Sequence, residues 1–181
     1  KQVELWQQGG IRLIINRESQ SFAQRYHTEH GLSVCAYGLS CPDVPGLIER
    51  ATKLGYQIEY ADPECDTHRI AAITGPTGAL LYLVDSSDPS PHWEREFNYH
   101  AVDPNLYLSR VDHVATTLPL DQVLEATLLY RSLFQMQASP SVSLSDPLGL
   151  VKSQVMEVAD RSLAMTLNST LAEKTVVGQI Q

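Results

Sequence analysis

Hydrophobic and polar positions alternate near both ends of the chain, as is typical of β-strands that turn one face toward a core. Residues 1–16 read KQVELWQQGGIRLIIN, which is two strand-like segments around a polar turn. Residues 153–168 read SQVMEVADRSLAMTLN and align with them without a gap. Both copies end in asparagine, at Asn16 and Asn168. We therefore expect two copies of one β-rich module, with the chain starting and ending partway through a copy.

Helical periodicity appears three times between these copies. Ser19–Glu29 suits a surface helix that ends before Gly31, and Val44–Leu54 follows a capping Asp43. Asp121–Phe134 is rich in leucine, so we expect this third helix to be well covered, its apolar face widened by Leu124, Leu128 and Leu129. Strands are predicted at residues 33–39, 69–73, 79–84 and 110–117. The expected order in each module is a strand, a helix and then three strands.

The division of the chain follows from its composition. Residues 1–85 form a first, partial module, and residues 106–181 form the start of a second module. Residues 86–105 are rich in proline, serine and aspartate and are interpreted as a linker.

Composition restricts the function further. A net charge of -8 over 181 residues disfavours a nucleic-acid or anionic-membrane surface, because phosphate binding needs clustered lysine and arginine. No apolar run is long enough to cross a bilayer and no signal peptide opens the chain, so we expect a cytoplasmic protein. The three cysteines lack a CxxC spacing and are interpreted as reduced, partly buried residues: Cys35, Cys41 and Cys65.

One histidine stands in an apolar strand. His113 lies in VDHVATTLP, where alternation turns it to the same face as Val111 and Ala115. Taken alone, such an imidazole is more often a satisfied core residue than a ligand. Alternation turns Asp112 to the opposite face, so we expect Asp112 to pack or cap rather than to orient His113.

Several segments, taken in order, resemble a known family. QGGIRLIIN, SFAQRYHTEHGLSVCAYGL and GPTGALLYLVD lie within residues 1–84, and VDHVATTLP, DPLGLVKSQVM, LAMTLN and GQIQ lie within residues 106–181. They resemble the 4-hydroxyphenylpyruvate dioxygenase family of the vicinal-oxygen-chelate (glyoxalase, bleomycin-resistance and extradiol dioxygenase) superfamily. Within it, they are similar to the dioxygenase-like C-terminal half of bacterial 3-dehydroshikimate dehydratase fusion proteins. The resemblance implies an α+β fold of paired βαβββ modules, both incomplete in this chain.

The resemblance also implies a metal site. In this family two histidines and a glutamate hold Fe(II) and leave one side open for substrate and O₂. The first ligand corresponds to His113, and the other two would lie beyond Gln181. Mg or Mn is the alternative metal. In the first module Val34 and Leu83 stand at the places of ligands, so that module is expected to be non-catalytic.

The substrate implied is an aromatic 2-oxo acid that reacts with O₂. Ser153, Asn168 and Gln179 match positions that hydrogen-bond its polar end in the family. An equally good alternative for Asn168 is a structural role, in which its side chain hydrogen-bonds the nearby backbone at the end of a strand. Asn16 supports this alternative, because it stands at the aligned position of the other copy. The remaining histidines are expected at the surface or in loops: His27, His30, His68, His92 and His100.

Three functions stay open at this point. The first is an Fe(II)-dependent dioxygenase that oxidatively decarboxylates and hydroxylates the 2-oxo acid. The second is an accessory domain of a bifunctional 3-dehydroshikimate dehydratase, with a barrel domain N-terminal to it. The third is a glyoxalase-like protein that binds a small molecule without turnover. Homo-oligomers are common for such modules, and the residues do not decide the oligomeric state.

Overall fold

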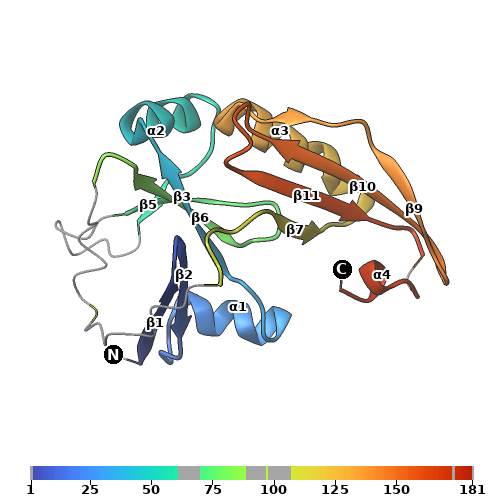
Figure 1. Ribbon diagram of the computed structural model, residues 1–181, viewed down its shortest axis with the longest axis horizontal. Coiled ribbons are helices and arrows are strands. Elements are labelled where there is room, and N and C mark those ends of the chain that lie inside the picture. The colour runs from blue at the N-terminus through green and yellow to red at the C-terminus, as the bar shows by residue number, and fades with distance from the viewer. Residues whose placement is uncertain (1, 61–69, 89–96, 98–106, 173, 181) are drawn as a thin grey trace. The chain divides into compact units, whose positions relative to one another are not determined.

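The computed structural model describes residues 2–60, 70–88, 97, 107–172 and 174–180 (Figure 1). The chain divides into two compact units, of which the first contains Lys1–Thr74 and Gly78–Val111. The second contains Gly75–Thr77 and Asp112–Gln181. The predicted linker at residues 86–105 lies mostly outside the described residues, so its boundaries stay a prediction.

The first unit contains a four-stranded sheet in the spatial order β3-β6-β5-β4. β3 is parallel to β6, and the other pairs are antiparallel. The helix α2 follows β3 and begins where the Asp43 side chain accepts a hydrogen bond from the Gly46 amide at 2.9 Å. The elements are β3 (Ala36–Cys41), α2 (Val44–Lys53), β4 (Glu59–Tyr60), β5 (Ala71–Thr74) and β6 (Leu80–Asp85). A strand, a helix and three strands therefore occur in the predicted order.

A separate hairpin and a helix precede this sheet in the first unit. β1 (Val3–Gln8) and β2 (Ile11–Asn16) form a two-stranded antiparallel sheet, and α1 (Phe22–His30) follows. The Ser21 side chain caps α1 by accepting from the Gln24 amide at 3.1 Å, and Gly31 at φ 69° ends it.

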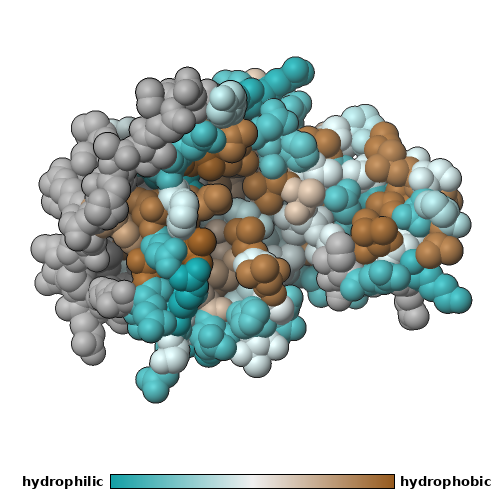
Figure 2. All heavy atoms as spheres, turned by 60° about the horizontal axis from the view of Figure 1, so that its bottom comes forward, coloured by the Kyte–Doolittle hydropathy of each residue, from teal (hydrophilic) through white to brown (hydrophobic). Residues whose placement is uncertain are grey.

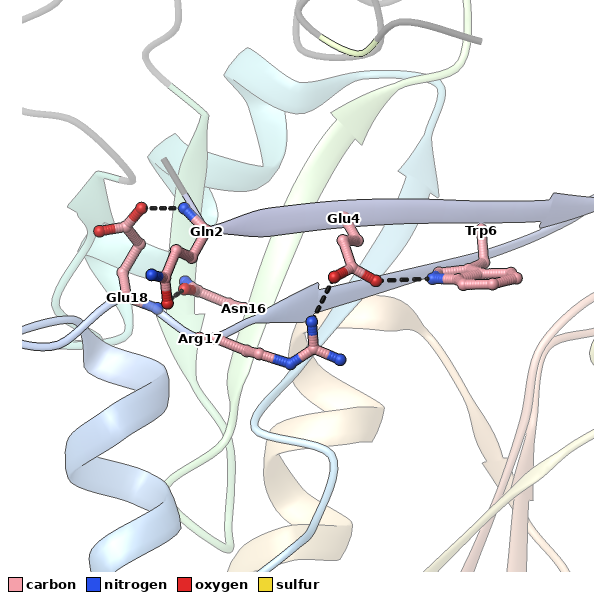
Figure 3. Close-up of polar contacts among 6 residues, drawn as sticks. All are labelled: Gln2, Glu4, Trp6, Asn16, Arg17 and Glu18. Atoms are coloured by element: carbon pink, nitrogen blue, oxygen red, sulfur yellow. Dashed lines mark hydrogen bonds and ion pairs between the residues drawn. The ribbon is translucent and has the colours of Figure 1, made fainter. Parts of the chain in front are cut away.

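Polar contacts join the open end of this hairpin (Figure 3). The Glu4 carboxylate accepts hydrogen bonds from Arg17 and, at 3.2 Å, from the indole nitrogen of Trp6. The Gln2 amide donates to the Glu18 carboxylate, and the Glu18 amide donates to the Asn16 side chain at 2.9 Å. These contacts are exposed, so each adds at most about 1 kcal/mol of stability.

The second unit repeats the arrangement of strands. Its sheet has the order β7-β11-β10-β8, with β9 also paired to β10, and β7 is parallel to β11. Here too the first strand lies beside the last strand of the unit. The elements are β7 (Val114–Thr117), the 3-10 helix η2 (Leu120–Gln122), α3 (Val123–Phe134), β8 (Gln137–Ala138), β9 (Val142–Asp146), β10 (Gly149–Glu157), β11 (Ala164–Ser169) and α4 (Val176–Ile180).

The core of the second unit lies between its sheet and α3, which crosses one face of the sheet (Figure 1). Alternate residues of three strands are buried on that face: Thr116, Met156, Met165 and Leu167. The helix buries Ala126, Leu129, Tyr130 and Leu133. These buried side chains, all of them apolar except Thr116, form the core between the helix and the sheet.

The prediction that α3 is covered around its apolar positions is wrong. Leu129 is buried, whereas Leu124 and Leu128 have exposed fractions of 81% and 63%. A helix on one side of a sheet buries only the stripe that faces the strands, and these two leucines lie outside that stripe. Figure 2 shows one face of the surface, on which apolar patches lie among hydrophilic ones.

Two strands begin later than predicted. The strand expected at residues 110–117 starts at Val114, which pairs with Met165 near the first residue of β11. The strand expected at residues 33–39 starts at Ala36, opposite the first residue of β6, Leu80. A strand is defined by its hydrogen-bonded neighbour, so each begins where its neighbour begins.

Candidate functional site

His113 lies immediately before β7, with its imidazole about half exposed. Its Nδ1 atom is 2.8 Å from the Asp112 carboxylate. The expectation that Asp112 points away from His113 is therefore wrong. Alternation holds only inside a regular strand, and the strand begins one residue later, so both side chains turn to the same side.

This contact determines which ring nitrogen of His113 is left for a ligand. A carboxylate beside Nδ1 favours a proton on that atom, which leaves the lone pair on Nε2. Histidines that bind metals commonly donate their other ring N–H to a carboxylate or carbonyl group in this way. The pair of His113 and Asp112 therefore suits one ligand position of a metal site.

A row of polar side chains crosses the sheet of the second unit. Ser153 on β10 lies directly opposite Asn168 on β11, and Asn168 lies beside Thr117 on β7. Cross-strand neighbours project from the same face of a sheet, so the three side chains form a row. Ser153 is buried, and Asn168 and Thr117 are half-buried. This row contains two of the predicted substrate residues, Ser153 and Asn168, and also Thr117, which no motif in the sequence indicated.

The side chains of the row have hydrogen-bonding capacity to spare. Within the part of the chain that the structure describes, neither the Ser153 hydroxyl nor the Asn168 amide makes a side-chain hydrogen bond. Buried hydroxyls usually have a partner, so a buried serine without one needs an explanation. Asn16 behaves differently, since its side chain accepts from the Glu18 amide at 2.9 Å. The strand-end interpretation thus holds for Asn16 and not for Asn168.

The other predicted site residues, His113 and Gln179, lie on other segments of the second unit. His113 is four residues before Thr117, which is about 13 Å along an extended strand. Gln179 lies on α4 with an exposed side chain, and its amide nitrogen is 3.4 Å from the Lys174 carbonyl oxygen. The described residues therefore place Ser153 directly opposite Asn168, whereas His113 precedes β7 and Gln179 lies on α4.

The metal-ligand chemistry of the described residues is limited. In the described ranges no group of three histidine, cysteine, aspartate or glutamate side chains lies close enough to hold a metal ion. His27 and His30 are exposed on α1, as predicted. The centroid of the His30 ring lies 4.2 Å from the centroid of the Tyr26 ring. The histidines at 68, 92 and 100 lie outside the described residues. His113 consequently fits a metal as one ligand of a larger set.

The first unit has apolar residues, which cannot bind a metal, at the two places that correspond to ligands. Leu83 is buried in its sheet, and Val34 is exposed before β3.

Cys35 and Cys41 are free thiols, and burial raises the pKa of both, so they stay protonated at neutral pH. Cys65 lies outside the described residues. Among the helices of the described ranges, none has the length and apolar composition needed to cross a membrane.

The fold and two similar solved structures define the class of protein. In each sheet a strand and a helix are followed by further strands, three in the first unit and four in the second. β3 lies beside β6 and β7 lies beside β11, and this is the glyoxalase-type vicinal-oxygen-chelate fold. The chain is similar to a xylose isomerase-like TIM barrel/4-hydroxyphenylpyruvate dioxygenase fusion protein, with a TM-score of 0.72 and 30% identity over 94% of this chain and 26% of that one. A mutant 4-hydroxymandelate synthase from Streptomyces coelicolor has the same fold, with a TM-score of 0.74 and 18% identity over 98% of this chain and 54% of that one.

Sequence comparison then gives the family. The model described as hydroxyphenylpyruvate dioxygenase, HPPD, N-terminal, matches residues 1–98, and the chain belongs to this family. The expected resemblance and α+β fold are thereby confirmed.

Two kinds of enzyme occur among the curated relatives. A 3-dehydroshikimate dehydratase of Pseudomonas aeruginosa is 34% identical over 99% of this chain. A 4-hydroxyphenylpyruvate dioxygenase of Pseudomonas sp. (strain P.J. 874) is 27% identical over the whole chain. The chain spans 28% of the dehydratase and 52% of the dioxygenase.

Proposed function

We propose that this chain is part of an Fe(II)-dependent dioxygenase module that acts on an aromatic 2-oxo acid. The observation that supports this most directly is the row of Ser153, Asn168 and Thr117, whose first two side chains have no hydrogen-bonding partner among the described residues. An amide and a hydroxyl orient a keto acid or a phenol without adding a competing charge. The pairing of His113 with Asp112 supports the metal-binding part of the proposal.

In this proposal each residue has a defined task. His113 binds the metal through Nε2, while the Asp112 carboxylate holds the ring in one orientation and one tautomer. Ser153 and Asn168 hydrogen-bond the polar end of the substrate. A bound Fe(II) ion would supply coordination of the 2-oxo acid and activation of O₂. The remaining ligands are expected in the sequence that follows residue 181 in the full-length protein, and Mg or Mn is the alternative metal.

The test uses full-length protein loaded anaerobically with Fe(II). We expect O₂ uptake with 4-hydroxyphenylpyruvate, and we expect His113→Ala to lose at least about tenfold in metal affinity, as removal of groups around a metal commonly does. His27→Ala is the matched control, because His27 is an exposed histidine on α1 and should bind no metal. Full iron binding and turnover in His113→Ala would contradict the proposal.

A second candidate is an accessory domain of a 3-dehydroshikimate dehydratase. The 34% identity to the Pseudomonas aeruginosa dehydratase and the likeness to a TIM-barrel fusion protein favour it. Here the full-length protein, loaded with Mg or Mn, should dehydrate 3-dehydroshikimate without O₂ uptake, and His113→Ala should leave that rate unchanged. Binding of the aromatic acid with neither reaction would favour the glyoxalase-like binding protein.

A further inference from the structure

We propose that Gly149 is a positioning residue for Gln179, because it leaves the space in which the segment before α4 rests on the sheet. The inference rests on the proposed function in one respect, namely that the substrate binds at the row of Ser153, Asn168 and Thr117. Its structural part is formed by residues of the second unit alone.

Gly149 lies against the connecting segment between β11 and α4 (residues 170–172, 174 and 175). A Cβ atom added at Gly149 would lie 2.5 Å from the Cβ of Ala172 and 3.1 Å from the Cγ2 of Thr175. The Ala172 Cβ is fixed to the backbone and cannot rotate aside, and the Thr175 side chain is fully buried. Any larger residue at position 149 would therefore push the connecting segment off the strand.

Two threonine hydroxyls attach the connecting segment to β10 and to α4. The Thr170 hydroxyl donates to the Leu150 carbonyl oxygen at 2.7 Å and accepts from the Ala172 amide at 3.0 Å. The Thr175 hydroxyl donates to the Ala172 carbonyl oxygen at 2.8 Å and accepts from the Gly178 amide at 3.0 Å, which caps the start of α4. Because these bonds run without a break from β10 to the first turn of α4, a shift of the connecting segment also shifts α4.

The connecting segment lies on the face of the sheet that carries the polar row. Alternation along β10 turns Gly149 and Ser153 to one face and Met156, which packs under α3, to the other. α4 contacts β11, the strand of Asn168 (Figure 1). Groups that bind a substrate need placement within about 0.5 Å. The space at Gly149 therefore sets where α4 presents Gln179 relative to the row.

The experiment compares Gly149→Ala with Gly38→Ala in the full-length protein. Both glycines lie within strands, and neither has the left-handed backbone that disfavours alanine. A Cβ at Gly38 meets only the Cγ2 of Val84, at an ordinary distance of 3.7 Å. The difference between the two variants therefore isolates the contact with the connecting segment from the general effect of a methyl group in a strand.

The first readout is hydrogen exchange of two amides in α4. The Gly178 amide donates to the Thr175 hydroxyl and the Gln179 amide to the Thr175 carbonyl oxygen, both at 3.0 Å. We expect both amides to exchange about tenfold faster in Gly149→Ala and at the wild-type rate in Gly38→Ala, because exchange follows the population of the locally open state.

The second readout is affinity for 4-hydroxyphenylpyruvate, measured anaerobically on Fe(II)-loaded protein. We expect Gly149→Ala and Gln179→Ala each to weaken binding about tenfold, as loss of a ligand hydrogen bond often does. In the Gln179→Ala background, Gly149→Ala should add less than about a twofold loss, because two residues that act through one contact are not additive. A glycine with a merely structural role would give additive losses.

Each outcome decides one part of the inference. Equal exchange rates in the two glycine variants would overturn the contact, and faster exchange with unchanged affinity would overturn the positioning role. Additive losses would likewise show that Gly149 does not act through Gln179. If wild type does not bind 4-hydroxyphenylpyruvate, the proposed function fails and the positioning role fails with it, whereas the exchange rates still decide the contact.

A second variant covers the case in which Gly149→Ala does not fold. Ala172→Gly removes the Cβ that an alanine at position 149 would meet at 2.5 Å. The double variant Gly149→Ala/Ala172→Gly should therefore fold and regain most of the protection of the Gly178 amide. Failure of the double variant to fold would overturn the steric basis of the inference.

Discussion

The hairpins β1–β2 and β10–β11 have matching sequences and different surroundings. Leu13 and Ile15 on β2 have exposed fractions of 61% and 40%, whereas the aligned Met165 and Leu167 on β11 are buried. The pattern of apolar residues is the same in both, but only the second hairpin has α3 packed on its apolar face. Alternation of apolar and polar residues therefore predicts a strand and does not by itself predict a core.

The two hairpins also differ in register. β1 and β2 are joined by two residues, with Gln8 opposite Ile11. β10 and β11 are joined by six residues, with Glu157 opposite Ala164. As a result Asn168 lies opposite Ser153, whereas Asn16 lies opposite Val3. A shift of two residues keeps every side chain on its face but changes its neighbour, and this shift places Asn168 beside a polar partner.

The largest expected effect tests the difference in burial. Leu167→Ala should lower the free energy of unfolding by about 3 kcal/mol, because it leaves a cavity in a packed core. Ile15→Ala at the aligned position should cost less than about 1 kcal/mol, because that side chain is already partly in water. Urea unfolding of both variants measures the two values. Equal losses would mean that β1–β2 is buried as deeply as β10–β11.

A smaller effect tests the difference between the two asparagines. Asn168→Ala should weaken binding of an aromatic 2-oxo acid about tenfold, as loss of a ligand hydrogen bond often does, and should leave unfolding nearly unchanged. Asn16→Ala should do the opposite and cost about 0.5–1 kcal/mol of stability, since its side chain accepts from the Glu18 amide. Calorimetric titration and urea unfolding distinguish the two results. A stability loss confined to Asn168→Ala would reverse the assignment.

The smallest effect concerns pH and the turn between β10 and β11. Hydrogen bonds from the Ser162 hydroxyl and amide lower the pKa of Asp160. Because the pKa is lower in the folded state, the ionised Asp160 carboxylate stabilises the turn at pH values above its unfolded pKa of about 3.9. This contribution is lost as the pH falls from there through the lowered pKa of the folded state. Amide exchange at Ser162 should therefore show extra opening of the turn in acid, relative to intrinsic rates.

The matched comparison for this prediction lies in the other hairpin. Asp160→Asn should abolish the acid-dependent opening, and the turn of Gly9 and Gly10 should lack it because neither residue titrates. Identical acid dependence in wild type and Asp160→Asn would contradict the assignment.

Local patterns predicted much of the fold. α2 was predicted to within one residue of its end because Asp43 caps it and its apolar residues recur at helical spacing. The hairpin of β5 and β6 was likewise predicted from two apolar runs around Gly75–Gly78. The start of β7 and the exposure of Leu124 and Leu128 were not predictable, because both depend on what lies beside them in space.

The candidate site divides in the same way. Ser153, Asn168 and His113 were selected from motifs in the sequence, and the types of chemistry they offer follow from the residues themselves. The contact of Asp112 with His113 and the membership of Thr117 in the polar row depend on where strands begin and how they pair. Pairing of strands far apart in sequence is set by turn length and by packing against helices.

The family, the helices and most of the strands, and the residue types at the site follow from the sequence alone, since these depend on local preference and motif. The division into four strands after α3, where three were predicted, does not. Which hairpin forms a core and which polar residues share a row depend on the tertiary structure. These are properties of neighbours in space, and one chain's alternation of polar and apolar residues is compatible with several sets of neighbours.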